Sequence, residues 1–175
     1  MVNKEELQKM FDLMCSGDMR AFEYIYNNLS TPLFTIIVRI IKDEALSEDV
    51  LQDFFIKLFL SPPKSQVRNP RAYMFQMAHN LAIDNLRKKD DHVHLDSCIG
   101  AIINIPAGEQ SAEMYIEEAM KILPGTECEI VSLKLNGGFT FREIANIMGI
   151  PIGTAIWKYQ KAISRLQKIL SGGVK

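Results

Sequence analysis

Hydrophobic residues recur along most of the chain at the spacing of an α-helix. After Asp18, a stripe of Phe22, Ile25, Tyr26 and Leu29 repeats at intervals of three and four residues, which places these side chains on one helical face. The alternation of period two that indicates a half-buried strand is hardly seen. The pattern therefore predicts an all-α protein.

Capping residues indicate where these helices begin. A capping box, in which a side chain and an acid three residues later satisfy exposed backbone amides, is predicted for Asn3 with Glu6, Thr126 with Glu129, and Thr140 with Glu143. Further starts are predicted at Asp18, at Ser47, and at Asn69, which is followed by Pro70 at the first helical position. The predicted stops are rich in proline and glycine and lie at residues 61–63, 124–125, 136–138 and 172–173.

The helical periodicity lapses between residues 90 and 110, where acids lie among glycine and proline. This segment predicts a linker between two small helical domains, residues 1–89 and 111–175. Ile99, Ile102, Ile103 and Ile105 make the linker too apolar for a freely solvated tether. We therefore expect it to lie on a surface of one domain or of a partner.

A helix-turn-helix is predicted from Thr140 onward. Ala145 is small where two helices must cross closely, and Gly149 allows a left-handed turn between them. The second helix opens near Pro151, which is either its first residue or the residue before it. Its basic residues follow one another at spacings of three and four, as a ridge suited to DNA phosphates: Lys158, Lys161, Arg165 and Lys168. An ordinary solvated face is the alternative interpretation.

Composition and charge agree with a globular protein that has one strongly basic end. The chain has 175 residues, of which 47% are hydrophobic and 23% charged, enough for one sizeable core or two small ones. The net charge is -1, yet residues 140–175 hold six bases and one acid. The apolar runs at 33–41 and 54–60 are too short to cross a membrane, and the N-terminus lacks a signal pattern. We therefore expect a cytoplasmic protein without membrane insertion.

The sequence contains few features that indicate a metal site, a cofactor site or a catalytic site. Cys15, Cys98 and Cys128 are widely separated, which predicts reduced thiols. His92 and His94 lie near Cys98, but a fourth ligand is missing, so a polar linker is favoured over a metal site. Neither a glycine-rich phosphate loop nor a GxSxG motif occurs. We expect no enzyme activity, no metal, no cofactor and no small-molecule substrate.

Residues 47–60 have more apolar positions than one buried stripe needs, beside a polar side formed by Glu48, Asp49, Gln52 and Asp53. That side is either solvated or a protein-binding surface. The stretch 61–89 carries features suited to opened DNA, a proline-stiffened loop with bases and then a helix that ends in Arg87-Lys88-Lys89. Core packing is expected for at least two of Tyr73, Phe75 and Met77.

Two blocks of sequence resemble the extracytoplasmic-function sigma factors of bacterial RNA polymerase. The first block comprises residues 21–26, 48–55 and 69–87 and is similar to the family's second conserved region. The second block comprises residues 123–131, 141–145 and 153–154 and is similar to its fourth region. The resemblance implies two helical domains, sigma region 2 at 1–89 and sigma region 4 at 111–175, that direct transcription initiation.

The resemblance also implies partners and sites. Core RNA polymerase is expected to bind, through the clamp coiled coil of its largest subunit, at Glu48, Asp49, Gln52, Asp53 and Phe55. The residues that the resemblance assigns to contact with the minus-ten promoter element are Lys64, Arg68, Asn69, Arg71, Tyr73, Asn80, Asp84, Arg87 and Lys88. The minus-thirty-five element is assigned to Arg142, Thr154, Lys158, Lys161 and Arg165. An anti-sigma factor is a further candidate partner, and Asp84 has a second interpretation as a structural residue.

The chain departs from the family after Gly153-Thr154, where valine, lysine, serine or threonine, and arginine are common. Here the residues are Ala155, Ile156, Trp157 and Lys158. Trp157 is interpreted as an exposed anchor or as a lid over the core, and core or domain packing is slightly favoured. The alternative function is a helix-turn-helix regulator that does not bind core polymerase.

Overall fold

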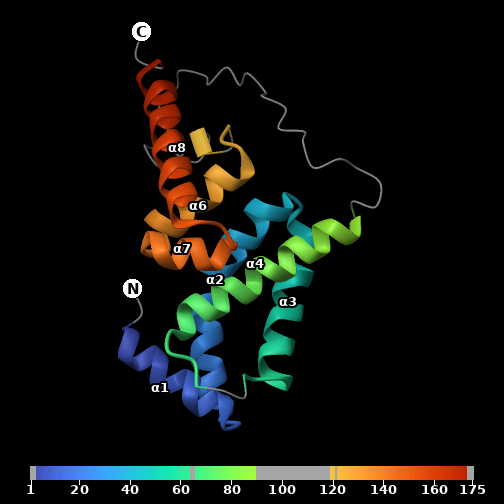
Figure 1. The fold of residues 1–175 in the computed structure, drawn as a ribbon. Helices are drawn as coiled ribbons and strands as arrows, with labels where there is room; N and C mark the ends of the chain where they lie inside the picture. Colours follow the sequence, from blue (N-terminus) through green and yellow to red (C-terminus); the bar gives the residue numbers. More distant parts are fainter. Residues whose placement is uncertain (1–2, 64–65, 90–118, 121, 173–175) are drawn as a thin grey trace, which may run out of the picture. The chain divides into compact units, whose positions relative to one another are not determined.

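The computed structural model describes residues 3–63, 66–89, 119–120 and 122–172, and within these ranges every regular element is a helix (Figure 1). The all-α prediction is therefore confirmed. The helices are α1 (Lys4–Cys15), α2 (Met19–Ile41), α3 (Glu44–Leu60), α4 (Pro70–Lys89), α6 (Gly125–Leu135), α7 (Phe141–Met148) and α8 (Ile152–Gly172). They divide into two compact units, one with α1 to α4 and residues 146–149, and one with α6, α8 and residues 141–145 of α7.

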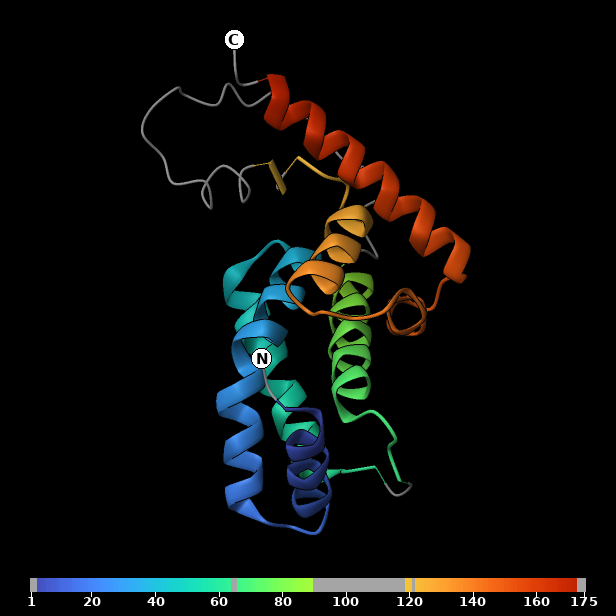
Figure 2. The same ribbon diagram turned by 90° about the vertical axis from the view of Figure 1, so that its left-hand side faces the viewer.

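The first unit is a bundle in which α2 and α3 run antiparallel and α4 packs against both (Figures 1 and 2). α1 packs on α2 and α4. Large side chains from all four helices fill the core with almost no exposed area, among them Phe11, Leu33, Phe54 and Met74. Burial of such a side chain contributes about 1.5–3 kcal/mol, so this core is the main source of stability in the first unit.

Helix starts in the first unit follow the sequence signals in most places. Asp18 caps α2 by accepting hydrogen bonds from the amides of Arg20 and Ala21, and Asn69 caps α4 by accepting one from Ala72. The start predicted at Ser47 is wrong. Asp43 caps α3 instead, and the buried Ser47 hydroxyl donates to the Asp43 carbonyl at 2.6 Å.

The second unit is built mainly by α6 and α8, which pack along each other. Its core contains Leu123, Cys128, Val131, Ala162 and Leu166. The capping box predicted for Thr126 and Glu129 is wrong, because Pro124 occupies the N-cap position and no side chain caps the helix. The Thr126 hydroxyl oxygen instead accepts a hydrogen bond from Lys158 Nζ at 3.1 Å. Glu129 is buried.

The helix-turn-helix has the local geometry that the sequence predicts. Thr140 and Glu143 form a reciprocal capping box, in which the Thr140 amide donates to the Glu143 carboxylate at 2.8 Å and the Glu143 amide donates to the Thr140 hydroxyl at 3.3 Å. Gly149 has φ +64°, in the left-handed region that the turn requires. α8 begins at Ile152, so Pro151 is the residue before the helix and not its first residue.

Candidate protein and nucleic-acid interfaces

The polar side of α3 is an acidic stripe on the surface of the first unit. Glu48, Asp49, Gln52 and Asp53 are all exposed, at spacings that hold them on neighbouring positions of one helical face. Farther along the helix the same side continues with Ile56, which is 55% exposed, and Leu60, which is 73% exposed. The outward side of α3 thus changes from acidic to apolar along its length.

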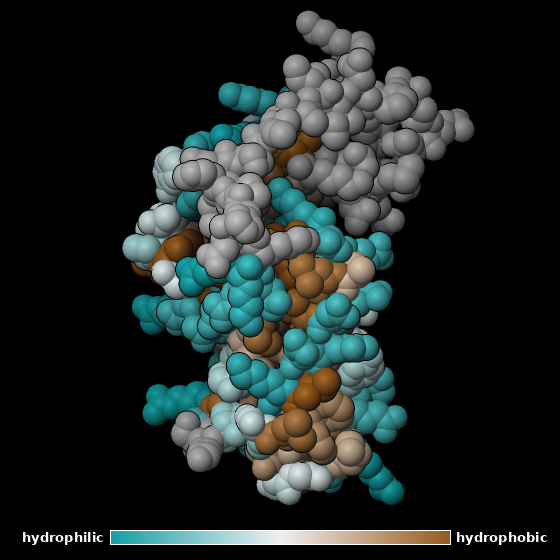
Figure 3. Space-filling view, turned by 90° about the vertical axis from the view of Figure 1, so that its right-hand side faces the viewer, coloured by the Kyte–Doolittle hydropathy of each residue, from teal (hydrophilic) through white to brown (hydrophobic). Residues whose placement is uncertain are grey.

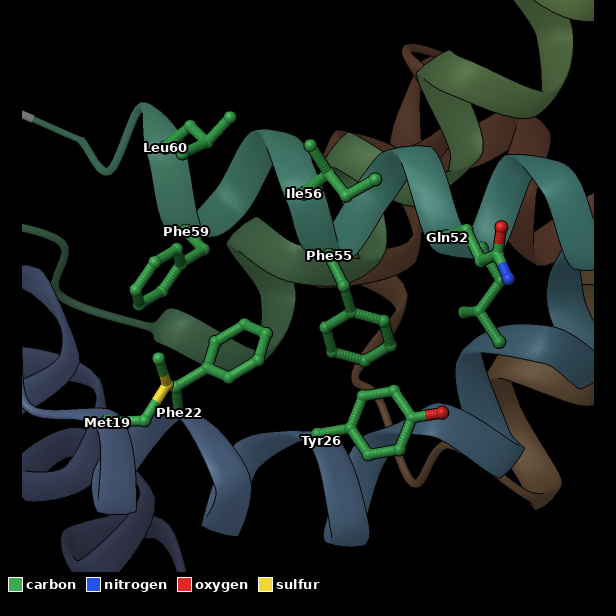
Figure 4. A pocket seen from close by; sticks show the side chains of 9 residues that line it. Met19, Phe22, Tyr26, Gln52, Phe55, Ile56, Phe59 and Leu60 are labelled. Carbon is green, nitrogen blue, oxygen red and sulfur yellow. The ribbon is translucent and has the colours of Figure 1, made fainter.

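An apolar groove of about 420 Å³ lies between α2 and the second half of α3. Figure 4 shows Phe55 and Phe59 of α3 pointing toward Phe22 and Tyr26 of α2, with Met19 at one end and Gln52 at the other. Ile56 and Leu60 project away from α2. Figure 3 shows hydrophobic side chains among hydrophilic ones on the side where α3 lies in Figure 1.

Aromatic rings that pack mainly edge to face form the floor of this apolar groove. Phe22 meets Phe55 and Phe59 edge to face, with ring centroids 6.0 and 5.0 Å apart, and Tyr26 lies 4.8 Å from Phe55. Phe55, which the resemblance assigns to a partner, is only 4% exposed and therefore supports the groove from below. Ile56 is exposed beside the groove and is a candidate contact that the sequence analysis does not name, although the surplus of apolar positions in residues 47–60 is its signal.

A second, more polar cleft lies where the end of α3 meets α4. Tyr73, Asn80 and Asp84 line it at spacings of seven and four residues along α4, together with Lys57 and Ser61 from the end of α3. Its volume is about 390 Å³. The structure thus brings together three of the residues predicted to contact the minus-ten element.

The remaining minus-ten candidates lie in other places. Arg68, Arg87 and Lys88 are exposed near the two ends of α4, whereas the half-buried Arg71 places its guanidinium 5.8 Å from the Phe75 ring. Asn69 uses its side chain as the cap of α4. Tyr73 is half-buried and packs edge to face on Phe11, and Phe75 is buried. Lys64 lies outside the described residues.

Two bases of the predicted basic ridge on α8 contact α6. Arg165 Nη1 donates to Glu127 Oε2 at 2.7 Å, and the Glu127 side chain is 5% exposed while that of Arg165 is 41% exposed. Lys158 Nζ donates to the Thr126 hydroxyl. These contacts orient α8 on α6, so Arg165 and Lys158 hold the second helix of the motif in place. Arg142 is exposed on α7, and Thr154 is half-buried in the first turn of α8.

We expect Arg165→Met to destabilise the second unit by about 1–3 kcal/mol, because the buried carboxylate of Glu127 loses its charged partner. The partial exposure of Arg165 keeps the loss below that of a fully buried pair. Urea unfolding measures this difference, and Arg142→Met, at an exposed base of α7, serves as the control. If the losses of unfolding free energy in Arg165→Met and Glu127→Gln add exactly in the double variant, the two side chains do not stabilise each other.

Trp157 is exposed rather than packed in a core. Its side chain is 55% exposed, and Lys161 Nζ lies 4.7 Å above its ring. Of the favoured interpretation, core packing is therefore wrong, and packing between the domains stays a prediction. Ala155, Ala162 and Leu166 turn the buried side of α8 inward, and Trp157 lies on the opposite side of the helix.

Among the described residues, no group of three histidine, cysteine or acidic side chains is placed to hold a metal ion. His92, His94 and Cys98 lie outside these ranges. Cys15 and Cys128 are reduced thiols, and burial together with the nearby Asp12 raises the pKa of Cys15. In the part of the chain that the structure describes, no helix has the length and apolarity needed to span a bilayer.

The structure defines an all-helical class of protein, with a helix-turn-helix and a separate helical bundle that has an acidic stripe and an apolar groove on its surface. Comparison with known proteins makes this class specific. Residues 25–92 match the family model Sigma-70 region 2. The chain is 21% identical over 175 residues to the ECF RNA polymerase sigma factor SigK of Mycobacterium bovis (BCG), with 94% of both chains covered. It is 22% identical over 176 residues to SigK of Mycobacterium ulcerans, with 95% of this chain and 94% of the relative covered.

Solved structures agree at the level of the fold. The sigma factor RpoE of Bartonella quintana, solved with the anti-sigma factor NepR, has a TM-score of 0.67 at 22% identity and covers 87% of this chain and 98% of its own. CnrH, solved with the cytosolic domain of CnrY, has a TM-score of 0.68 at 18% identity and covers 95% and 98%. The chain is an RNA polymerase sigma factor of the extracytoplasmic-function type, which directs transcription initiation at specific promoters.

Proposed function

We propose that the acidic stripe of α3 and the adjoining apolar groove bind the clamp coiled coil of the largest polymerase subunit. The observation that supports this most directly is that the whole acidic stripe, and the part of the groove that α3 supplies, lie inside the Sigma-70 region 2 match. Acids steer the encounter with a basic coiled coil, and the apolar residues Ile56 and Leu60 supply area that is removed from water. Glu48, Asp49, Gln52 and Asp53 are the polar contacts, and Phe55 supports them from within the bundle.

The polar cleft on α4 is proposed to receive the minus-ten element. Unpaired bases need stacking faces and hydrogen-bonding groups, while their backbone needs positive charge. Tyr73, Asn80 and Asp84 supply the first two requirements, and Lys57 supplies a base in the same cleft. The further cationic candidates for contact with the minus-ten element are Arg68, Arg87 and Lys88, which are exposed near the ends of α4, and Lys64. Asn69 and Arg71 shape the start of α4 rather than line the cleft.

The second unit is proposed to hold duplex DNA at the minus-thirty-five element, with residues 1–89 as region 2, 90–110 as linker and 111–175 as region 4. Arg142 and Lys161 then contact phosphates, and Thr154 lies beside them at the start of α8. The protein acts in the cytoplasm and without catalysis. Because RpoE and CnrH were solved with an anti-sigma factor and with CnrY respectively, we also propose an anti-sigma partner.

The test compares two variants of the full chain for binding to purified core polymerase and to promoter DNA. We expect Asp49→Arg to weaken polymerase binding about tenfold at low salt, because it reverses an exposed charge on the docking face. The double change Arg142→Gln and Lys161→Gln should leave polymerase binding intact. It should lower the salt dependence of DNA binding by the holoenzyme by about two phosphate contacts.

These variants avoid Lys158 and Arg165, whose contacts with α6 make a loss of DNA binding ambiguous. Wild-type protein that fails to bind core polymerase at low salt would contradict the proposed docking face. Equal polymerase affinity of Asp49→Arg and wild type would remove α3 from the interface. Unchanged DNA binding by the double variant would remove the second unit from the promoter contact.

A further inference from the structure

The most exposed face of α8 is not its basic side. Gly153, Trp157, Gln160 and Ser164 follow one another at spacings of four, three and four residues, and all of them are exposed. Such spacings place them in one line along the helix. This line begins in the first turn of the second helix of the helix-turn-helix, the part that enters the major groove in proteins that use the motif.

The bases of α8 lie beside this line. Arg165 and Lys158 reach sideways to Glu127 and Thr126 of α6, and Lys161 lies over the Trp157 ring at 4.7 Å. The exposed line therefore presents an aromatic ring and an amide to a partner, flanked by positive charge. α7 and α8 together contain the bases Arg142, Lys158, Lys161, Arg165 and Lys168 against the single acid Glu143.

Gly153 supplies a second indication that a partner approaches this face closely. A Cβ atom added at Gly153 would meet nothing within 4 Å, so no neighbour inside the protein requires a glycine there. A glycine in a helix is less favourable than alanine by about 1 kcal/mol. Because glycine has no side chain, an external backbone such as that of a nucleic acid could approach the helix closely at this position.

We propose that Trp157 and Gln160 are sequence-reading residues of this sigma factor, and that their ligand is the major groove of duplex promoter DNA. The inference rests on the proposed role of the second unit. The apolar face of Trp157 packs on the C5-methyl group of a thymine, and the Gln160 amide pairs with N6 and N7 of an adenine. Lys161 braces the ring and contributes charge toward the phosphates.

The spacing of the two residues suits neighbouring base pairs. Three residues of an α-helix rise by about 4.5 Å, and successive bases of a DNA strand are about 3.4 Å apart. Trp157 and Gln160 are one helical turn apart on the same line. We therefore expect them to specify base pairs that are adjacent or separated by a single step.

The experiment selects duplex DNA with the full chain bound to core polymerase. The probe is a library in which the upstream and downstream promoter elements are both randomised. Wild type should enrich a defined upstream sequence, and Trp157→Ala and Gln160→Ala should each lose preference at one position within it. At the affected position we expect discrimination to fall about 5-fold to 150-fold, the value of a lost base contact of about 1–3 kcal/mol. Arg142→Gln, at an exposed base of α7, is the control and should weaken binding evenly across sequences.

A second arm tests the thymine contact itself. Deoxyuridine in place of the thymine that Trp157 reads removes only the C5-methyl group, so it should weaken binding by wild type and leave Trp157→Ala unaffected. If Trp157→Ala and wild type respond equally, the assignment of Trp157 is wrong. If both variants enrich the same upstream sequence as wild type, the whole inference is wrong while the proposed function stands. If wild type enriches no upstream sequence, the proposed role of the second unit fails with it.

Discussion

Gly137→Val is expected to unfold the second unit and leave the first unit folded. A Cβ atom at position 137 would lie 2.5 Å from the Leu133 carbonyl oxygen and 2.6 Å from the Phe139 ring. Neither neighbour has room to move, because the same carbonyl accepts a hydrogen bond from the Phe139 amide and the Phe139 side chain is only 3% exposed. We expect a loss of about 3 kcal/mol or more, a large fraction of the stability of a small domain.

Hydrogen exchange resolved by helix measures this effect. Amides of α6 to α8 should lose protection while those of α2 to α4 keep it, because the two units have separate cores. Gly153→Ala is the matched control. Its Cβ has open space and helical surroundings, so it should stabilise α8 by about 0.5–1 kcal/mol. If the amides of α6 to α8 are protected as strongly in Gly137→Val as in the wild type, the turn at Phe139 accommodates the valine with little loss of stability.

The second large effect is expected from Ile56→Glu on the docking face. Ile56 is 55% exposed on the outer side of α3, so the free energy of unfolding should change by less than about 0.5 kcal/mol. A carboxylate there would remove apolar area from the contact and would have to lose its hydration against the partner. We expect polymerase binding to weaken about 30-fold or more, the size of a hot-spot loss of about 2 kcal/mol or greater.

Surface plasmon resonance with immobilised core polymerase measures this loss. Asn27→Glu places the same acid at an exposed position of α2 outside the lining of the groove, and it should bind as wild type does. Equal affinity for Ile56→Glu and Asn27→Glu would show that the apolar end of α3 lies outside the polymerase interface. The acidic stripe would then carry the contact alone.

Local sequence signals predicted much of the fold because they depend on neighbouring residues. The caps at Asp18 and Asn69 and the Thr140 capping box act across two or three residues, and the turn at Gly149 needs only its own backbone freedom. Ser47 was misassigned because Asp43, one turn earlier, competes for the same role and forms the cap. Asp43 and Ser47 both have side chains that suit an N-cap. Which of them caps the helix depends on where the chain leaves α2.

The site shows the same division. Spacing along α3 and α8 was enough to predict an acidic stripe, a basic ridge and a helix-turn-helix, because helical periodicity fixes which residues of one helix share a face. Which of those faces is free depends on the neighbouring helices, and sequence periodicity contains no information about them. Thr126 was assigned to a cap, yet in the folded unit it accepts a hydrogen bond from Lys158.

The helical class and the helix-turn-helix could be predicted from the sequence, since each rests on interactions between residues close together in the chain. The two blocks that resemble sigma regions 2 and 4 could be recognised from their residues. Only the tertiary structure decided that Phe55 is buried while Ile56 and Trp157 are exposed. It also decided that Arg165 pairs with Glu127, which is 38 residues away along the chain. The physical reason is that burial and ion pairing depend on which helices pack together, and that packing is set by the whole core.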